Sequence, residues 1–321
     1  MSLLRDRLSS VQIFFMIFFY MLAGFRLYGE GSFAVIGFVT LFCVCVCIIA
    51  SAICAGYGSF SEFSHAVMGK YSFILRFAAL LLAAIPFAKD VISFAKSADG
   101  FYDGGNAFLI IGALAFLCVY ASAKGICVSA RFSELCVFPL ICVLPLSLLG
   151  GGKGGFDTAF SESLLFESFF IMGAIPVFFS LFLRNTDRAQ MSDFAKSSSF
   201  HPPAVFCGIS AVVLAALAHI FLRLNGAESV LSVFFLSFFS LTRLLVFTVT
   251  ALDILGIPES TDASKKAKKT AVFCAFCVVS LNLSIAFPGF SGSFLAVGNV
   301  IFPCAVFSAL MLKRAYSQNQ I

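Results

Sequence analysis

Residues 229–255 have the sequence SVLSVFFLSFFSLTRLLVFTVTALDIL, in which only Arg243 and Asp253 are charged. About 20 apolar residues in an α-helix cross a bilayer core of roughly 30 Å. Backbone groups in lipid must form their hydrogen bonds within the protein, and this run lacks the alternation of apolar and polar residues that marks a membrane β-strand. The stretch therefore predicts a transmembrane helix.

Apolar runs of this kind recur along nearly the whole chain. Of its 321 residues, 60% are hydrophobic and 12% are charged, whereas about a quarter of the residues of an ordinary soluble domain are charged. The sequence predicts about ten transmembrane helices, at residues 11–29, 32–55, 71–95, 106–123, 133–150, 164–183, 203–222, 229–255, 270–287 and 293–312. The predicted fold class is an all-α integral membrane protein, with residues 1–321 as one polytopic domain.

Lysine and arginine residues are distributed unequally between the two sides of this topology. Of the 21 basic residues, fourteen fall on the side that holds both termini, four fall on the other side and three lie within spans. Basic residues concentrate in cytoplasmic loops, so both termini are predicted to be cytoplasmic. The net charge of +5 is spread over many loops, and we therefore expect no nucleic-acid partner.

The sequence contains no pattern that predicts an enzyme. The predicted cytoplasmic loops are short, and GxSxG and HExxH motifs are absent. The glycine-rich run at 150–155 carries Lys153 without a following Ser or Thr, so it is interpreted as a linker. Cys274 and Cys277 form a CxxC string inside a predicted membrane helix, with no second ligand pair. We therefore expect no catalytic residue, no cofactor, no metal site and no structural disulfide.

Short stretches in several parts of the chain follow one another in a recognisable order and spacing. They are QIFF at 12–15, FSHAVMGK at 63–70, ASAKGI at 121–126 with ARFSEL at 130–135, and GAIP at 173–176. Together they resemble the amino acid/polyamine/organocation transporter superfamily, and within it the spore germination permeases, which are the B subunits of nutrient germinant receptors.

This resemblance implies an inverted repeat of five plus five helices, with repeat one at about 11–150 and repeat two at about 164–312, and with helices one and six broken near the membrane centre. Ends of broken helices expose backbone N–H groups and carbonyls that bind substrates and ions. Gly24 in helix one, and Gly173 and Pro176 in helix six, are the residues expected at such breaks. They are candidate substrate-binding positions.

Arg243 is the fourth candidate for substrate binding. It lies about 14 residues, or roughly 21 Å, from the outer end of the predicted helix eight, close to the bilayer centre. A charge at that depth costs at least about 2.5 to 3.5 kcal/mol and faces the interior of the bundle. Arg243 either meets a substrate carboxylate or the free carbonyls of the broken helices, or it is a structural residue held by interior carbonyls.

Three charged residues nearer the outer side are candidates for gating or coupling. Asp90 is the obvious partner for Arg243, but the predicted helix ends place it some 10 to 15 Å away in depth, which disfavours direct pairing. Lys89, its neighbour, either extends to the interface or forms part of a gate. Glu167 opens the predicted helix six, where a carboxylate also suits a helix N-terminus.

Three functional hypotheses fit these observations. The first is a permease-like protein of the spore germination type, which binds a small nutrient such as an amino acid and acts with other receptor subunits in the bacterial cytoplasmic membrane or the spore inner membrane. The second is a secondary transporter of amino acids or organic cations coupled to protons or sodium. The third is a membrane scaffold that binds no solute, because one fold hosts all three functions.

Overall fold

The computed structural model describes residues 8–28, 32–54, 60–99, 107–149, 168, 170–173, 202–225, 230–257 and 262–286. Helices are the regular elements of these residues, and no strand occurs among them. The helices are α1 (Ser10–Tyr28), α2 (Phe33–Cys54), α3 (Phe60–Met68), the 3-10 helix η1 (Gly69–Tyr71), α4 (Ser72–Asp99), α5 (Ala107–Lys124), α6 (Ile126–Leu135), α7 (Val137–Leu149), α11 (Pro202–Leu224), α12 (Val230–Ile254) and α13 (Ala263–Ala286). The all-α class is confirmed.

Helix boundaries agree with the hydropathy pattern where no polar residue continues the helix. Helices α1, α2, α5, α11 and α12 each begin and end within two residues of the predicted spans. Among the described residues, five apolar segments are long enough to cross a membrane, namely Ser10–Tyr28, Phe60–Phe94, Ile126–Leu149, Val205–Leu224 and Ser237–Ile254. The predicted span at 293–312 and most of the span at 164–183 lie outside the described residues, so the total of about ten, the inverted repeat and the cytoplasmic termini stay predictions.

Two predicted cytoplasmic loops contain helices instead. The predicted loop at 56–70 includes α3, which buries Phe60 and Phe63, and the backbone N–H of Phe60 donates to the Asp253 carboxylate at 3.3 Å. The predicted loop at 124–132 includes α6, which continues after a turn at Cys136 into α7. Average hydropathy missed both helices because each buries only one face.

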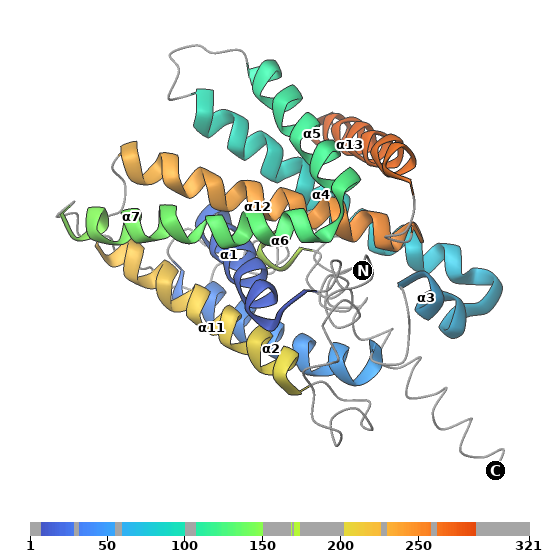
Figure 1. The fold of residues 1–321 in the computed structure, drawn as a ribbon, viewed down its shortest axis with the longest axis horizontal. Coiled ribbons are helices and arrows are strands. Elements are labelled where there is room, and N and C mark those ends of the chain that lie inside the picture. Colours follow the sequence, from blue (N-terminus) through green and yellow to red (C-terminus); the bar gives the residue numbers. More distant parts are fainter. Residues whose placement is uncertain are drawn as a thin grey trace, which may run out of the picture.

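Helix α12 runs through the middle of the bundle, with α4 and α5 on one side and α1 on the other (Figure 1). Helix α1 packs between α12 and α11, and α13 lies beside α5. The polar residues Thr242, Arg243, Thr248 and Thr250 of α12 are all buried. The centre of the bundle therefore carries buried polar side chains, one of them charged.

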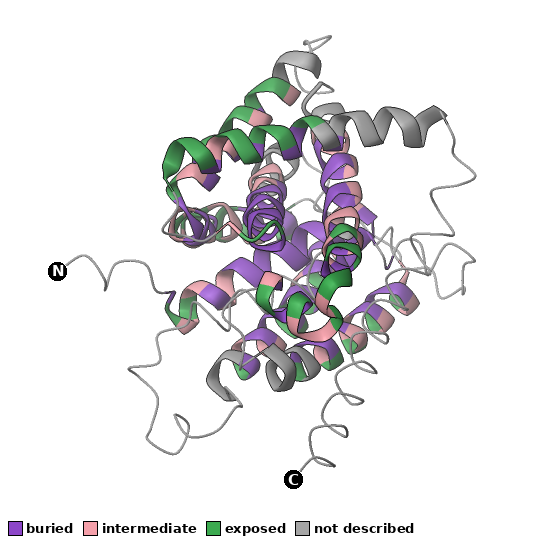
Figure 2. Cartoon of the chain, turned by 90° about the vertical axis from the view of Figure 1, so that its right-hand side faces the viewer, coloured by how far each residue is buried: buried purple, intermediate pink, exposed green. Residues whose placement is uncertain are grey.

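Large apolar side chains cover much of the outside. Phe73, Phe77, Phe116, Phe138 and Phe206 are all exposed, and Figure 2 shows exposed residues on the outer faces of helices whose inner faces are buried. A soluble monomer rarely exposes apolar surface on this scale. Lipid is the solvent that suits such a surface, which identifies an all-α membrane protein.

Helix α1 is continuous from Ser10 to Tyr28, so the break expected at Gly24 is absent from it. Five residues of the expected helix six are described, and they include a turn. Ser168 and Phe170 to Met172 are helical, and Gly173 is a turn residue with a φ of +49°. The described helical residues are therefore followed by a turn at Gly173, while the residues beyond it lie outside the described part of the chain, so the interruption of helix six stays a prediction. Gly24 instead lies against Arg243.

Candidate functional site

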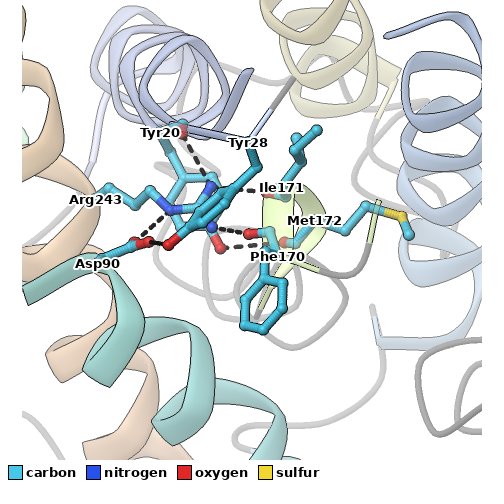
Figure 3. Close-up of polar contacts among 7 residues, drawn as sticks. All are labelled: Tyr20, Tyr28, Asp90, Phe170, Ile171, Met172 and Arg243. Carbon is cyan, nitrogen blue, oxygen red and sulfur yellow. Dashed lines mark hydrogen bonds and ion pairs between the residues drawn. The ribbon is translucent and has the colours of Figure 1, made fainter. Parts of the chain in front are cut away.

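Arg243 is fully buried, and it is the largest of the fully buried side chains among the described residues. Its Nε donates to Asp90 Oδ2 at 2.6 Å, and its Nη1 donates to the carbonyl of Ile171 at 2.7 Å. Nη2 donates to the carbonyl of Phe170, and Nη1 makes a long contact of 3.5 Å with the carbonyl of Tyr20. One guanidinium thus joins α12 to α4, to α1 and to the segment 170–173 (Figure 3).

The ion pair between Arg243 and Asp90 corrects the prediction that they lie too far apart. Asp90 lies nine residues before the end of α4 at Asp99, not five, because the helix continues past the polar residues after 95. Arg243 lies 13 residues after the start of α12 at Val230. At 1.5 Å per residue the depth difference is about 6 Å, which the long arginine side chain spans.

The carbonyls that Arg243 contacts belong to the last helical residues before Gly173. The final carbonyls of a helix lack amide partners within the helix and carry roughly half a negative charge between them. Arg243 bonds the carbonyls of Phe170 and Ile171, and the Tyr20 hydroxyl donates to the carbonyl of Met172 at 3.1 Å. Side chains from α12 and α1 therefore cap this helix end.

Aromatic rings enclose the ion pair. The guanidinium carbon of Arg243 lies 4.5 Å from the centre of the Tyr20 ring and 5.3 Å from that of Phe247. The Tyr28 hydroxyl donates to the other oxygen of Asp90, Oδ1, at 2.6 Å. The cation thus has aromatic faces beside it, and both oxygens of its partner carboxylate accept hydrogen bonds.

Gly24 gives the guanidinium its room. A Cβ built on Gly24 would overlap Nη1 of Arg243 and would lie 3.0 Å from the carbonyl oxygen of Ile171. Gly24 is therefore required for close approach of α1 to the site, not for unwinding of the helix. Tyr20, Gly24 and Tyr28 are four residues apart, so all three face the ion pair from one side of α1.

Lys89 lies at the edge of the same cluster. Its ammonium nitrogen is 3.8 Å from the centre of the Phe170 ring and 4.8 Å from that of the Tyr28 ring. The side chain is half-buried and does more than extend to the interface, because two aromatic faces hold the charge. Of the predicted site residues, the structure brings together Gly24, Gly173, Arg243, Asp90 and Lys89, while Pro176 and Glu167 lie outside the described residues.

The substitution Tyr28→Phe removes the hydroxyl that bonds Asp90 and keeps the ring. We expect a loss of about 1.5 to 3 kcal/mol in the free energy of unfolding, since the bond is made to a carboxylate. Unfolding by SDS in mixed micelles measures it. Tyr120→Phe is the matched control because Tyr120 is 55% exposed, and an equal loss in both variants would contradict the assignment.

Replacing Gly24 by Ala forces a methyl group into the space of Arg243 Nη1. We expect a loss of about 1 to 3 kcal/mol from overpacking. Gly37→Ala in α2 is the control, because a Cβ there meets no atom within 4 Å, and alanine is a better helix former than glycine. The two variants are compared by thermal unfolding, and an unchanged melting temperature for Gly24→Ala would show that the guanidinium position is wrong.

Lys89→Met keeps much of the side-chain length and removes the charge over the two rings. We expect a loss of about 1 kcal/mol, the usual size of a partly exposed cation–π contact. Lys89→Arg should retain most of this contact. Lys124→Met serves as control, because Lys124 is exposed and lies 5.9 Å from the Tyr120 ring centre. A melting temperature of Lys89→Met equal to that of the wild type would contradict a stabilising cation–π contact of Lys89.

Metal-ligating groups are scarce in the described part of the chain. None of its residues forms a cluster of three or more His, Cys, Asp or Glu side chains. Ten of the twelve cysteines lie in this part of the chain, and no disulfide joins any of these ten. The one carboxylate at the centre, Asp90, is engaged by Arg243 and Tyr28.

No protein-family model and no curated protein matches this sequence. Among solved structures, the chain is similar to a crystal structure of the manganese transporter of Eremococcus coleocola in complex with an aromatic bis-isothiourea substituted compound. The TM-score is 0.55 at 12% sequence identity, over 94% of this chain and 74% of that one. At this identity the likeness concerns the fold. The chain has the all-α fold of a membrane transporter, and the resemblance to the spore germination permeases stays a prediction.

Proposed function

We propose that the protein is a permease-like membrane protein that binds a small solute, an amino acid by the sequence resemblance, next to Arg243. One observation carries this proposal. A fully buried arginine joins α1, α4 and α12 to a helix end at Gly173. Ionisable residues inside a membrane bundle mark solute or ion pathways, and helix ends at the midplane form solute sites in transporters.

The weakest contact of Arg243 suggests where a solute carboxylate would bind. Nη1 reaches the Tyr20 carbonyl at 3.5 Å, the outer limit of a hydrogen bond. A solute carboxylate is a charged acceptor and can approach Nη1 more closely than the Tyr20 carbonyl does. Nη1 should therefore exchange the Tyr20 carbonyl for the solute carboxylate when the solute binds. The bonds to Asp90 and Ile171, at 2.6 and 2.7 Å, remain in place.

The same geometry disfavours a dissolved metal ion as the solute. The guanidinium already bonds the carbonyls and the carboxylate that would ligate a cation, and its positive charge repels a second cation. Manganese is therefore named here only for the structural neighbour, and an amino acid is proposed for this chain.

Binding of each of the twenty amino acids and of Mn²⁺ to the purified protein in nanodiscs, followed by thermal shift, tests the proposal. We expect stabilisation by at least one amino acid and none by Mn²⁺. Arg243→Lys keeps the charge and loses the planar fork. This variant should therefore need at least about ten times more of the amino acid to reach the same thermal shift. Arg76→Lys, near the start of α4 and far from Asp90, should leave the shift unchanged.

Uptake into proteoliposomes then separates the functional alternatives. Accumulation of the bound amino acid by the protein alone supports a secondary transporter. Binding without accumulation supports a germinant-receptor role with partner subunits. No shift with any amino acid would contradict the solute site and favour a scaffold.

A further inference from the structure

The atoms around Arg243 form a set that binds cations. The backbone oxygens of Phe170, Ile171 and Tyr20 and one carboxylate oxygen of Asp90 all point at the guanidinium (Figure 3). Oxygen ligands of this kind bind hard cations, and carbonyls at interrupted helices bind the coupling ions of transporters. In this chain a side chain occupies the place of the ion.

We propose that the centre of the bundle is a cation-binding site whose occupant is the protein's own Arg243. Removal of that side chain leaves a vacant site that takes a free guanidinium or alkylguanidinium ion. The wild-type protein consequently needs no dissolved sodium or divalent ion at this position. The inference does not rest on the proposed transport function, because it concerns occupancy and stability without any solute.

The local charges require a cation. Asp90 supplies one negative charge, and the helix end at Gly173 supplies roughly half a negative charge more. The side chains of Asp90 and Arg243 are both fully buried, at 0% exposure. Without the guanidinium, the buried Asp90 carboxylate would lose its countercharge and would lie next to the partial negative charge of the carbonyls.

The shape of the site selects guanidinium over other cations. Donors Nε, Nη1 and Nη2 each bond a different acceptor, on α4 and on the helix end before Gly173, as only a planar fork does. The Tyr20 ring lies 4.5 Å from the guanidinium carbon, which suits a flat delocalised ion. An ammonium or a spherical metal ion lacks this match.

The variant Arg243→Ala tests the proposal by chemical rescue. Thermal unfolding of the purified variant is measured with 0 to about 20 mM guanidinium or methylguanidinium chloride, a range well below denaturing concentrations, and with the same concentrations of NaCl and MnCl2. We expect guanidinium to restore more than half of the lost melting temperature, with saturation, and NaCl and MnCl2 to restore almost none. Wild type should respond to none of the four salts.

Two control variants separate a specific site from a general salt effect. Arg76→Ala removes another arginine, on α4, whose Nη1 bonds Ser61 at 3.3 Å, and guanidinium should not stabilise it. The double variant Arg243→Ala with Asp90→Asn removes the carboxylate, and rescue should be lost. If Arg243→Ala yields no folded protein, it is expressed and purified in about 10 mM methylguanidinium, where recovery of monodisperse protein is expected.

Three results would overturn the proposal. The first is a folded Arg243→Ala variant that guanidinium does not stabilise, or one that stays unrecoverable with methylguanidinium present. The second is equal rescue by NaCl or MnCl2, which would show a site without guanidinium selectivity. The third is saturable stabilisation of the wild type by sodium or manganese that Asp90→Asn abolishes, since a dissolved ion would then share the site.

Discussion

Arg243→Leu should lower the free energy of unfolding by about 3 to 5 kcal/mol, the largest single effect expected in this protein. The substitution removes the cation that pairs with the buried Asp90 carboxylate, which keeps its bond from the Tyr28 hydroxyl. It also removes the guanidinium donors to the carbonyls of Phe170 and Ile171. SDS titration in mixed micelles, with recovery of monodisperse protein as a second readout, measures the loss.

A double-variant cycle separates the ion pair from the carbonyl contacts. Asp90→Asn alone keeps an acceptor for Tyr28 but loses the charge, so we expect a loss of about 2 to 4 kcal/mol from the unpaired guanidinium. The double variant Asp90→Asn with Arg243→Leu should lose less free energy of unfolding than the two single variants lose together, because the second substitution removes a charge that the first already left unpaired. Full additivity would show that the two residues do not interact.

Arg76→Leu is the matched control for the loss of an arginine. Arg76 is half-buried, and its bond to Ser61 spans 3.3 Å, so a loss below about 1 kcal/mol is expected for a partly exposed side chain. If Arg76→Leu were as destabilising as Arg243→Leu, the centre of the bundle would not be the place where charge matters most.

The sequence predicts the helices of this protein better than their connections. Runs such as 229–255 are apolar over nearly their whole length, and the helix that this run forms begins and ends within two residues of the predicted limits. Helix α4 extends past Lys96 to Asp99, because polar residues at a helix end can continue the helix where it leaves the membrane. That extension places Asp90 deep enough to meet Arg243, and hydropathy could not show it.

Part of the site was visible in the sequence and part could not be. The sequence identifies Arg243, because a single charge inside an apolar run is costly in a membrane unless it faces the interior of the bundle. Tyr20, Gly24 and Tyr28 also carried a signal, since their spacing of four puts polar and small residues on one face of α1, but only Gly24 was singled out. The contacts of Arg243 with the carbonyls of Phe170 and Ile171 could not be predicted, because every residue has a carbonyl and only the fold shows which of them face the guanidinium.

Gly173→Ala should cost about 2 to 5 kcal/mol, the second large effect. A φ of +49° is a left-handed conformation, which costs an alanine roughly 1 to 2 kcal/mol. The new methyl group would also overlap the Tyr20 hydroxyl and lie 2.8 Å from Cζ of Phe247, which adds about 1 to 3 kcal/mol of overpacking. Because Tyr20 bonds the carbonyl of Met172, the overlap would also disturb the helix end that Arg243 caps.

Gly69→Ala isolates the second contribution. Gly69 has a φ of +55°, close to that of Gly173, but a Cβ there meets no atom within 4 Å. Both variants therefore share the backbone strain, and the difference between their unfolding free energies measures the crowding against Tyr20 and Phe247. Adding Tyr20→Phe to Gly173→Ala removes the overlapping hydroxyl and should recover part of that difference. Equal losses in the two glycine variants would mean that the helix end at Gly173 is held by its backbone alone, and that the packing between Tyr20, Phe247 and Arg243 does not fix the centre of the bundle.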